Sequence, residues 1–313
     1  MKRILESKKA LFFTTVLVAV CILFLGCGRL EKDNEEEIQQ QTALQGTQKK
    51  GAEVNPEIIG KTTFPLNTYY DDMALCEQGT GNMVADALKA AGVGAEMAFI
   101  NAGSIRRRGV TGRTNIPVGD ITMGDIILLF PFDNLLTTLN RARPSTVVLI
   151  SLTGKVLKEV FENSFSRRLP RGPGTSFGRF LQVAGIEVHA SALNPVGSRI
   201  IKLVLTSTGT EIDLNDDVQT YRAAIPLKYI KGTDRYSDFD QYWDIFAKGS
   251  DIVDTGIFIF DATVDFIKAN SPLAYPSECF KNLGNRIIIT PKLTDLHRKM
   301  SPDNSLKTGR FLA

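Results

Sequence analysis

The sequence predicts an α+β (mixed α/β) domain in which several helices pack against a mixed sheet. Three observations lead to this fold class. Apolar residues at helical spacing alternate with β-branched runs from about residue 60 to residue 290. Segments typical of strands outnumber those typical of helices. The chain is 43% hydrophobic and 23% charged, a globular balance that excludes disordered, collagen-like and disulfide-dense classes for most of its length.

Apolar spacing, caps and terminating Gly or Pro residues predict the helices. They cover 82–91, a short segment between the N-cap Thr122 and Pro131, 155–163, and a strongly apolar segment from a cap at Asp254 or Thr255 to about Ala269. Runs of β-branched and apolar residues predict the strands. They cover 95–101, 146–152, one long strand over 180–190, 199–205, 220–227 and 284–290. A basic loop rich in Gly and Pro is expected over 165–179.

The N-terminus has the pattern of a secretory signal. Residues 1–9 are basic, and an uncharged apolar run follows over 10–26. The run ends in the sequence FLGC, which resembles a bacterial lipobox whose cysteine, here Cys27, receives the lipid. Residues 1–27 are therefore expected to be a lipoprotein signal peptide. The alternative is an uncleaved membrane anchor, although the run is at the lower limit of what spans a bilayer.

Both alternatives place the rest of the chain on the non-cytoplasmic side of a membrane. The lipobox predicts an exported, membrane-anchored lipoprotein that faces the periplasm or the cell surface. Residues 28–59 are polar and lack aromatic side chains, so they are expected to form a flexible tether. The segment 60–300 is the expected functional domain.

The net charge of +3 belongs to the signal segment. Residues 1–26 carry +3 by themselves, so the remaining residues sum to zero. A broad basic face is the footprint of a nucleic-acid-binding protein, and we therefore expect no nucleic-acid partner.

Two of the four cysteines fall in the expected domain, Cys76 and Cys279. An oxidising compartment would allow them to form a disulfide. The alternative is a pair of separate buried thiols, and spacing alone does not distinguish the two.

Four segments, in order and spacing, resemble the C-terminal, substrate-binding domain of the 5'-nucleotidase family. They read EQGTGNMVADAL (77–88), AFINAGSIR (98–106), GDITMGDIILLFPFDN (119–134) and GRFLQVAGIEV (178–188), the last followed by NPVGSRI (194–200) and YRAAIPLKYIKGTDRY (221–236). The resemblance covers about residues 60–240. It implies a mixed α/β fold and a nucleotide or nucleoside ligand.

The second segment predicts one side of the ligand site. Asn101 offers a donor and an acceptor after a strand, and Gly103 allows a ligand to approach the backbone. Arg106 supplies a planar fork suited to phosphate, and the resemblance implies these roles. The alternative for Arg106 is a solvated basic turn, because Arg107 and Arg108 follow it.

The third segment and the end of the resemblance predict the other side. A loop Phe after Pro131 makes a rigid platform for a flat ring, and the resemblance implies that Phe132 stacks on the base and that Asn134 contacts it. A core position is the alternative for Phe132. The resemblance also implies a role for Asp234 at the ribose or the loop. Lys228 stands where the family has a second stacking Phe, so Tyr229 substitutes only if the loop rearranges.

Complete family members carry a metallophosphoesterase domain whose two metal ions are bound by several His, Asp and Asn residues. The 313 residues contain only His189 and His297 and none of the expected metal motifs. Ala74, three residues before Glu77 of the first segment, also stands where the family often has a phosphate-binding Arg. We therefore expect no catalytic residue, metal or cofactor in this chain, and divalent metals would belong to a catalytic partner.

Three hypotheses follow. The first is that the chain is the nucleotide-binding part of an extracytoplasmic 5'-nucleotidase, works with a separate metallophosphoesterase, and is inactive alone. The second is a non-catalytic nucleotide-binding lipoprotein. The third is a surface interaction lipoprotein that has kept the fold and lost the ligand.

Overall fold

The computed structural model describes residues 55–74, 76–105, 115–130, 145–166, 178–191, 193–231, 240–276 and 286–290. All of the elements described below belong to one unit, Lys50–Ala313. The signal peptide, most of the tether and Cys27 lie outside the described residues, so the expected domain boundaries stay predictions. None of the helices in the described ranges is both long enough and apolar enough to cross a bilayer.

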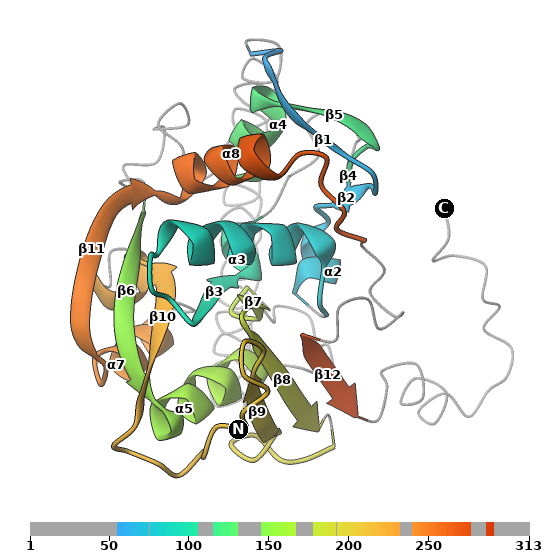
Figure 1. The fold of residues 1–313 in the computed structure, drawn as a ribbon. Coiled ribbons are helices and arrows are strands. Elements are labelled where there is room, and N and C mark those ends of the chain that lie inside the picture. The colour runs from blue at the N-terminus through green and yellow to red at the C-terminus, as the bar shows by residue number, and fades with distance from the viewer. Residues whose placement is uncertain are drawn as a thin grey trace, which may run out of the picture. The chain divides into compact units, whose positions relative to one another are not determined.

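A five-stranded mixed sheet is the centre of the fold (Figure 1), which confirms the predicted class. Its strand order is β11 (Ser250–Phe258), β6 (Thr146–Thr153), β10 (Thr220–Pro226), β3 (Met97–Asn101) and β7 (Leu181–Ala184). Strands β10 and β3 are parallel, and the other neighbours are antiparallel.

Helices cover both faces of this sheet, as the uninterrupted apolar runs of β3 and β6 require. On one face lies α3 (Gly79–Ala91), where the backbone at Gly92 approaches Ala224 of β10, and α8 (Ile259–Asn270) packs on α3. On the other face α5 (Gly154–Phe165) packs edge to face, with the Phe161 and Phe99 ring centroids 5.3 Å apart. Every residue of β3 is buried as a result.

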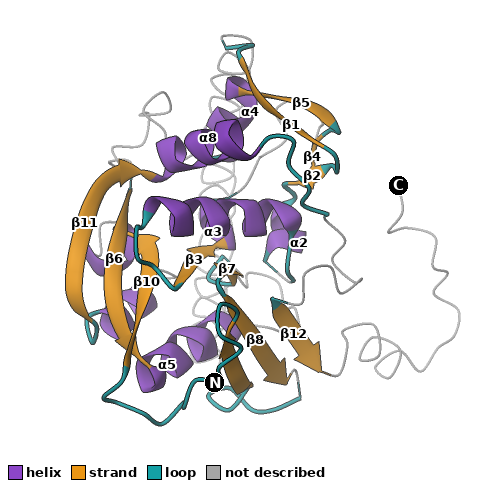
Figure 2. Ribbon diagram, viewed as in Figure 1, coloured by secondary structure: helices purple, strands orange, loops and turns teal. Residues whose placement is uncertain are grey.

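Smaller sheets and short helices complete the unit (Figure 2). The second sheet has the order β12 (Ile287–Thr290), β8 (Ile186–Ser191) and β9 (Ile200–Leu205). Two strand pairs join β1 (Ile58–Thr62) to β5 (Gly119–Thr122) and β2 (Leu66–Asn67) to β4 (Asn115–Ile116). The remaining helices are α2 (Tyr70–Met73), the 3₁₀ turn η1 (Ala102–Ser104), α4 (Met123–Leu129), α6 (Lys228–Lys231) and α7 (Asp240–Phe246).

The predicted N-cap Thr122 is confirmed. Its hydroxyl accepts a hydrogen bond from the Asp125 N–H at 3.2 Å, and the Asp125 carboxylate accepts one from the Thr122 N–H at 3.0 Å. This reciprocal capping box satisfies two donors that the start of α4 would otherwise leave unpaired.

The prediction of one long strand over 180–190 is wrong. Gly185 has a φ of +74° and separates β7 from β8, which belong to different sheets. A β-carbon at this position would lie 2.1 Å from the Glu96 carbonyl oxygen, so only glycine fits the turn. The apolar run continues across the break because both strands are buried on their inner faces.

The predicted start of the last apolar helix is also wrong. Residues 250–258 form β11, which pairs with β6, and α8 begins at Ile259 after Phe258. Asp254 and Thr255 are typical helix caps in sequence, but the backbone of their segment is hydrogen-bonded to β6 as a strand. The predicted end before Pro272 is confirmed, since α8 ends at Asn270.

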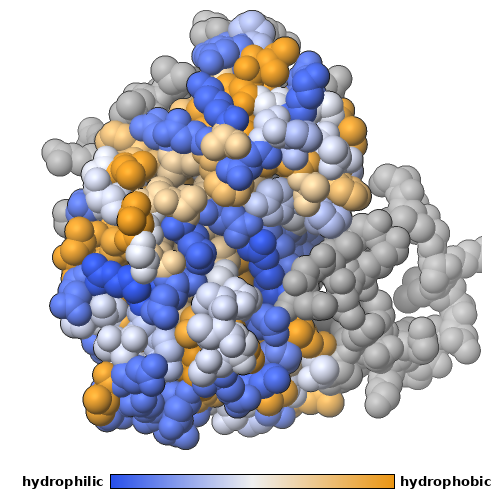
Figure 3. Space-filling model, viewed as in Figure 1, coloured by the Kyte–Doolittle hydropathy of each residue, from blue (hydrophilic) through white to orange (hydrophobic). Residues whose placement is uncertain are grey.

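Apolar side chains gather on the outer strand β11 (Figure 3), where Ile252, Val253 and Ile257 are 47%, 49% and 38% exposed. The register of β11 against β6 shifts twice. Such irregularities bend an edge strand and discourage pairing with another chain.

Two residues that stand out in the sequence, His189 and Cys76, lie in the described part of the chain. His189 lies on β8, the central strand of the second sheet, and contacts Glu187 at 3.4 Å with its side chain 21% exposed. Cys76 is disulfide-bonded. Cys279 lies outside the described residues, so the pairing of these two cysteines stays a prediction.

Candidate functional site

Strands β3 and β10 run in parallel and end at the same edge of the central sheet. Strands β6 and β7 begin there, because Pro226 pairs with Val147 and Asn101 pairs with Leu181. We call this place the β3–β10 edge. In open α/β sheets, ligands bind outside the carboxyl ends of the strands, so this edge is the candidate site.

The turn after β3 is bound to the chain that enters β7. The Ala102 N–H donates to the Phe180 carbonyl at 2.8 Å, and the Gly103 N–H donates to the Gly178 carbonyl at 2.9 Å. The Asn101 side-chain amide donates to the same Gly178 carbonyl at 2.7 Å. The second and fourth segments of the resemblance therefore meet at the β3–β10 edge.

Asn101 is 1% exposed, and both polar atoms of its side chain make hydrogen bonds. Its carbonyl oxygen accepts from the Tyr229 hydroxyl at 2.7 Å and from the Ser104 hydroxyl. Its backbone N–H donates to the Tyr229 oxygen at 2.6 Å. The structure thus brings the predicted residues Asn101, Gly103 and Tyr229 together, with Tyr229 completely buried.

A side chain at Gly103 would be crowded. A β-carbon there would lie 3.0 Å from the Asn101 amide nitrogen and 3.2 Å from the Gly178 oxygen. Substitution would require Asn101 or Gly178 to shift by a few tenths of an ångström. This close approach is the physical reason for glycine in the turn.

Four predicted site residues, Arg106, Phe132, Asn134 and Asp234, lie outside the described residues. Each of their segments has one described neighbouring stretch at the β3–β10 edge. Ile105 follows η1, Ser145 immediately precedes β6, and α6 (Lys228–Lys231) begins one residue after β10. The Lys228 N–H donates to the Ser145 hydroxyl at 3.2 Å, so two of these flanks are in contact.

At two positions this chain has a residue that differs from the family pattern, and both residues are buried. Lys228, at the place of the second stacking Phe, is 6% exposed, and Ala74, at the place of an Arg, is 2% exposed. A buried amine and a methyl group therefore occupy positions where the family presents an aromatic ring and a guanidinium.

The polar residues of the first segment connect α3 to other elements. The Glu77 carboxylate accepts hydrogen bonds from the N–H groups of Arg286 and Ile287 at 3.0 and 3.1 Å, and from the Asn82 amide at 2.7 Å. Gln182 accepts from the Gln78 N–H at 3.0 Å and donates to the Met73 and Cys76 carbonyls at 2.8 Å. These contacts hold β12 and β7 against α3.

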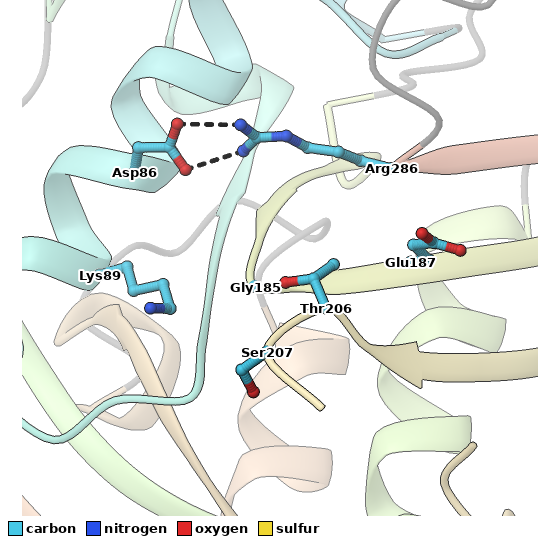
Figure 4. A pocket seen from close by; sticks show the side chains of 7 residues that line it. All are labelled: Asp86, Lys89, Gly185, Glu187, Thr206, Ser207 and Arg286. Carbon is cyan, nitrogen blue, oxygen red and sulfur yellow. Dashed lines mark hydrogen bonds and ion pairs between the residues drawn. The ribbon is translucent and has the colours of Figure 1, made fainter. Parts of the chain in front are cut away.

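A surface cleft of about 340 Å³ lies elsewhere, between α3 and the turn after β9 (Figure 4). Its lining residues are mostly polar and comprise Asp86, Lys89, Gly185, Glu187, Thr206, Ser207 and Arg286. Arg286 pairs with Asp86 through two hydrogen bonds of 2.8 and 2.9 Å. No spacing in the sequence predicts this cleft, because its walls come from distant segments.

The electrostatics of the cleft favour the ion pair. Burial lowers the pKa of Arg286, but the hydrogen bond and charge of Asp86, together with Tyr275 and Glu77, outweigh it and raise the pKa. Burial and the hydrogen bond to Asp86 raise the pKa of Tyr275. Arg286 therefore stays charged and Tyr275 stays neutral at physiological pH.

Within the described ranges, no three His, Cys, Asp or Glu side chains are grouped so that they could hold a metal ion.

Comparison with known proteins defines the class. The family model for the 5'-nucleotidase C-terminal domain matches residues 58–241, so the chain belongs to the 5'-nucleotidase C-terminal domain family. The match ends at the start of α7 and includes the whole β3–β10 edge.

Individual relatives agree with this assignment. The trifunctional nucleotide phosphoesterase protein YfkN of Bacillus subtilis is 28% identical over 288 residues, which are 90% of this chain and 16% of that protein. Human 5'-nucleotidase is 27% identical over 190 residues, 57% of this chain and 30% of that protein. The 5'-nucleotidase precursor of Thermus thermophilus superposes with a TM-score of 0.57 at 26% identity, over 75% of this chain and 40% of the other. The chain thus spans less than half the length of each.

Proposed function

We propose that this domain binds a nucleotide or nucleoside at the β3–β10 edge, as the substrate-binding part of an extracytoplasmic 5'-nucleotidase system. The observation that carries the proposal is the hydrogen bonding of Asn101, Gly103 and Gly178, which joins two family segments at the carboxyl end of β3. Residues Arg106, Phe132, Asn134 and Asp234 are proposed to complete the site, and one described neighbour of each of their segments lies at this edge.

Each proposed contact has a chemical task. Arg106 pairs with a phosphate oxygen through its planar fork. Phe132 stacks on the base, and Asn134 hydrogen-bonds to it. Asp234 accepts from ribose hydroxyls, and Gly103 allows the ligand to approach the backbone of the turn.

Hydrolysis is proposed to require a metallophosphoesterase outside these 313 residues. Two metal ions in such a domain activate water and stabilise the leaving oxygen, and the two histidines of this chain are too few to bind them as the family does. The proposed division of labour assigns binding to this chain and the divalent metals to its partner. Lipidation at Cys27 would hold the chain at the membrane, on the periplasmic or outer side.

A non-catalytic nucleotide-binding lipoprotein is the second candidate. The observation that favours it is Lys228, which is buried where the family has its second stacking Phe. A single aromatic platform would bind the base more weakly than a clamp of two.

Two assays separate these candidates. AMP and adenosine are titrated into the purified chain by calorimetry at millimolar ligand, with Phe132→Ala as the test variant and Phe64→Ala, a Phe that is 42% exposed after β1, as the control. The site is supported if Phe132→Ala abolishes binding and Phe64→Ala does not. The absence of a heat signal from the unaltered chain contradicts the site.

The second assay measures hydrolysis. Release of phosphate from AMP by this chain alone with added divalent metal would contradict the division of labour. A rise in AMP hydrolysis when the chain is added to a metallophosphoesterase that lacks such a domain would favour the first candidate over the second.

A further inference from the structure

Three aromatic rings form a buried stack directly behind the candidate site. Tyr229 of α6 and Tyr242 and Phe246 of α7 are 0% exposed. Their ring centroids are 5.6, 5.7 and 5.8 Å apart, and all three pairs are stacked. Tyr242 and Phe246 lie beyond residue 241, where the family match ends, so the stack extends the domain past its family boundary.

The two tyrosine hydroxyls of this stack reach the two chain segments that meet at the β3–β10 edge. The Tyr229 hydroxyl accepts from the Asn101 N–H at 2.6 Å and donates to the Asn101 side-chain oxygen at 2.7 Å. The Tyr242 hydroxyl donates to the Arg179 carbonyl at 2.6 Å. Asn101 in turn donates to the Gly178 carbonyl at 2.7 Å. The rings thus fix both segments that the Asn101 amide bridges.

The direction of these bonds determines how the Asn101 carboxamide is oriented. Its oxygen faces the hydroxyls of Tyr229 and Ser104, so its amide nitrogen is directed at Gly178. If the Tyr229 hydroxyl were removed, the Asn101 side-chain oxygen would keep one hydroxyl donor instead of two. The Asn101 backbone N–H would lose its acceptor. Leaving a buried donor unpaired is costly, so the turn would rearrange to satisfy it.

We propose that Tyr229, with Tyr242, is a positioning residue for the nucleotide site and does not contact the ligand. This role rests on the proposed function, and it replaces the substrate contact that the sequence alone suggests for Tyr229. The Tyr229 hydroxyl holds the Asn101–Gly103 turn in the one arrangement in which it joins Gly178.

The test compares Tyr229→Phe with Tyr275→Phe in the full chain. Both variants keep the ring and remove a hydroxyl that makes hydrogen bonds, but the Tyr275 hydroxyl bonds to Asp86 at the distant cleft. The readouts are the dissociation constant of AMP, at a temperature where every variant is folded, and the hydrogen–deuterium exchange rate of the Asn101 and Gly103 amides. A purely structural role would lower the melting temperature of both variants without changing the affinity of either.

We expect Tyr229→Phe to weaken AMP binding by at least about tenfold and to speed exchange of the Asn101 amide by a similar factor, the effect of losing buried hydrogen bonds. Tyr275→Phe is expected to change neither. Equal affinities in the two variants, or unchanged exchange at Asn101, would overturn the proposal.

Two further outcomes are informative. If the unaltered chain binds no AMP, the proposed function fails, and exchange at Asn101 and Gly103 alone decides whether Tyr229 positions the turn. If Tyr229→Phe does not fold, Tyr242→Phe replaces it, since that variant removes the bond to the Arg179 carbonyl, together with a hydrogen bond to Ser164, and leaves the Tyr229 hydroxyl in place. Tyr242→Phe is expected to weaken AMP binding in the same direction, and an unchanged affinity would count against the proposal.

Discussion

Asp86 and Arg286 form a bidentate ion pair that fastens the start of β12 to α3, some 200 residues earlier in the chain. Arg286 also donates to the Val183 carbonyl at 2.9 Å, and the Tyr275 hydroxyl donates to Asp86 at 2.6 Å. The pair is about three-quarters buried, with side-chain exposures of 24% for Asp86 and 23% for Arg286. It therefore links α3, β7 and the start of β12.

Removing the guanidinium is expected to destabilise the fold. Arg286→Ala leaves the Asp86 carboxylate with one partner in a largely buried place, and we expect a loss of about 1.5–3 kcal/mol in the free energy of unfolding. The exposed pair Lys61–Asp120, with exposures of 67% and 47%, is the control, and Lys61→Ala should cost no more than about 1 kcal/mol. Urea unfolding measures both, and equal effects would mean that the buried pair contributes no more than a surface one.

Gly185 is expected to tolerate no side chain. Gly185→Ala combines a φ of +74° with a contact of 2.1 Å to the Glu96 carbonyl oxygen, so a loss of about 3 kcal/mol is expected from strain and overpacking together. Gly209 has a similar φ of +68° and nothing near its missing side chain. Gly209→Ala should therefore cost only about 1–2 kcal/mol, the strain of the backbone alone. Denaturant midpoints that fall equally in the two variants would refute the steric part of this account.

Alkaline pH is expected to weaken the fold through Tyr242. Burial raises the pKa of the Tyr242 phenol, so the folded state keeps this proton above the pH at which an unfolded tyrosine loses it. Its contribution is fully present below about pH 10 and falls by about 1.4 kcal/mol per pH unit above it. Tyr242→Phe should make the free energy of unfolding less dependent on pH between about pH 10 and about pH 12. The same slope in both proteins would show that Tyr242 ionises without unfolding.

Arg106 and Arg108 lie in the same basic run, but only Arg106 matches the family position. Arg106→Ala should weaken AMP binding by about tenfold or more, because a bidentate bond to phosphate is lost. Arg108→Ala should leave the affinity within about twofold, since Arg108 lies outside the family segment that ends at Arg106. Adenosine, which has no phosphate, should bind both variants alike. Calorimetry with both ligands is the measurement, and equal effects on AMP would reduce Arg106 to a member of a basic turn.

Much of the fold could be predicted from local patterns. The helix at Met83–Leu88, the Thr122 cap and the strand at 146–152 depend on spacing and capping that a sequence displays directly. The break at Gly185 and the strand β11 could not, because each depends on a partner far away in the chain. The turn at Gly185 packs against the Glu96 carbonyl, and β11 is a strand because it pairs with β6.

Three of the predicted site residues, Asn101, Gly103 and Tyr229, lie together at the β3–β10 edge, but their arrangement was not predictable. Motifs place Asn101 and Gly103 after a strand, yet nothing in the sequence shows that Tyr229 reaches Asn101 from 128 residues away. Tyr242 carries no motif and lies past the family match. Long-range hydrogen bonds between buried groups decide such positions, and they leave no spacing to detect.

The most direct test of the account is to map AMP on the folded chain by the amide chemical shifts of isotope-labelled protein during a titration to millimolar AMP. Nucleotide binding at the β3–β10 edge should shift the amides of Asn101, Gly103 and Gly178, while Gly94 and Gly209 stay unchanged. Shifts confined to the cleft lined by Lys89, Thr206 and Ser207, or no shift at any amide, would contradict nucleotide binding at the β3–β10 edge.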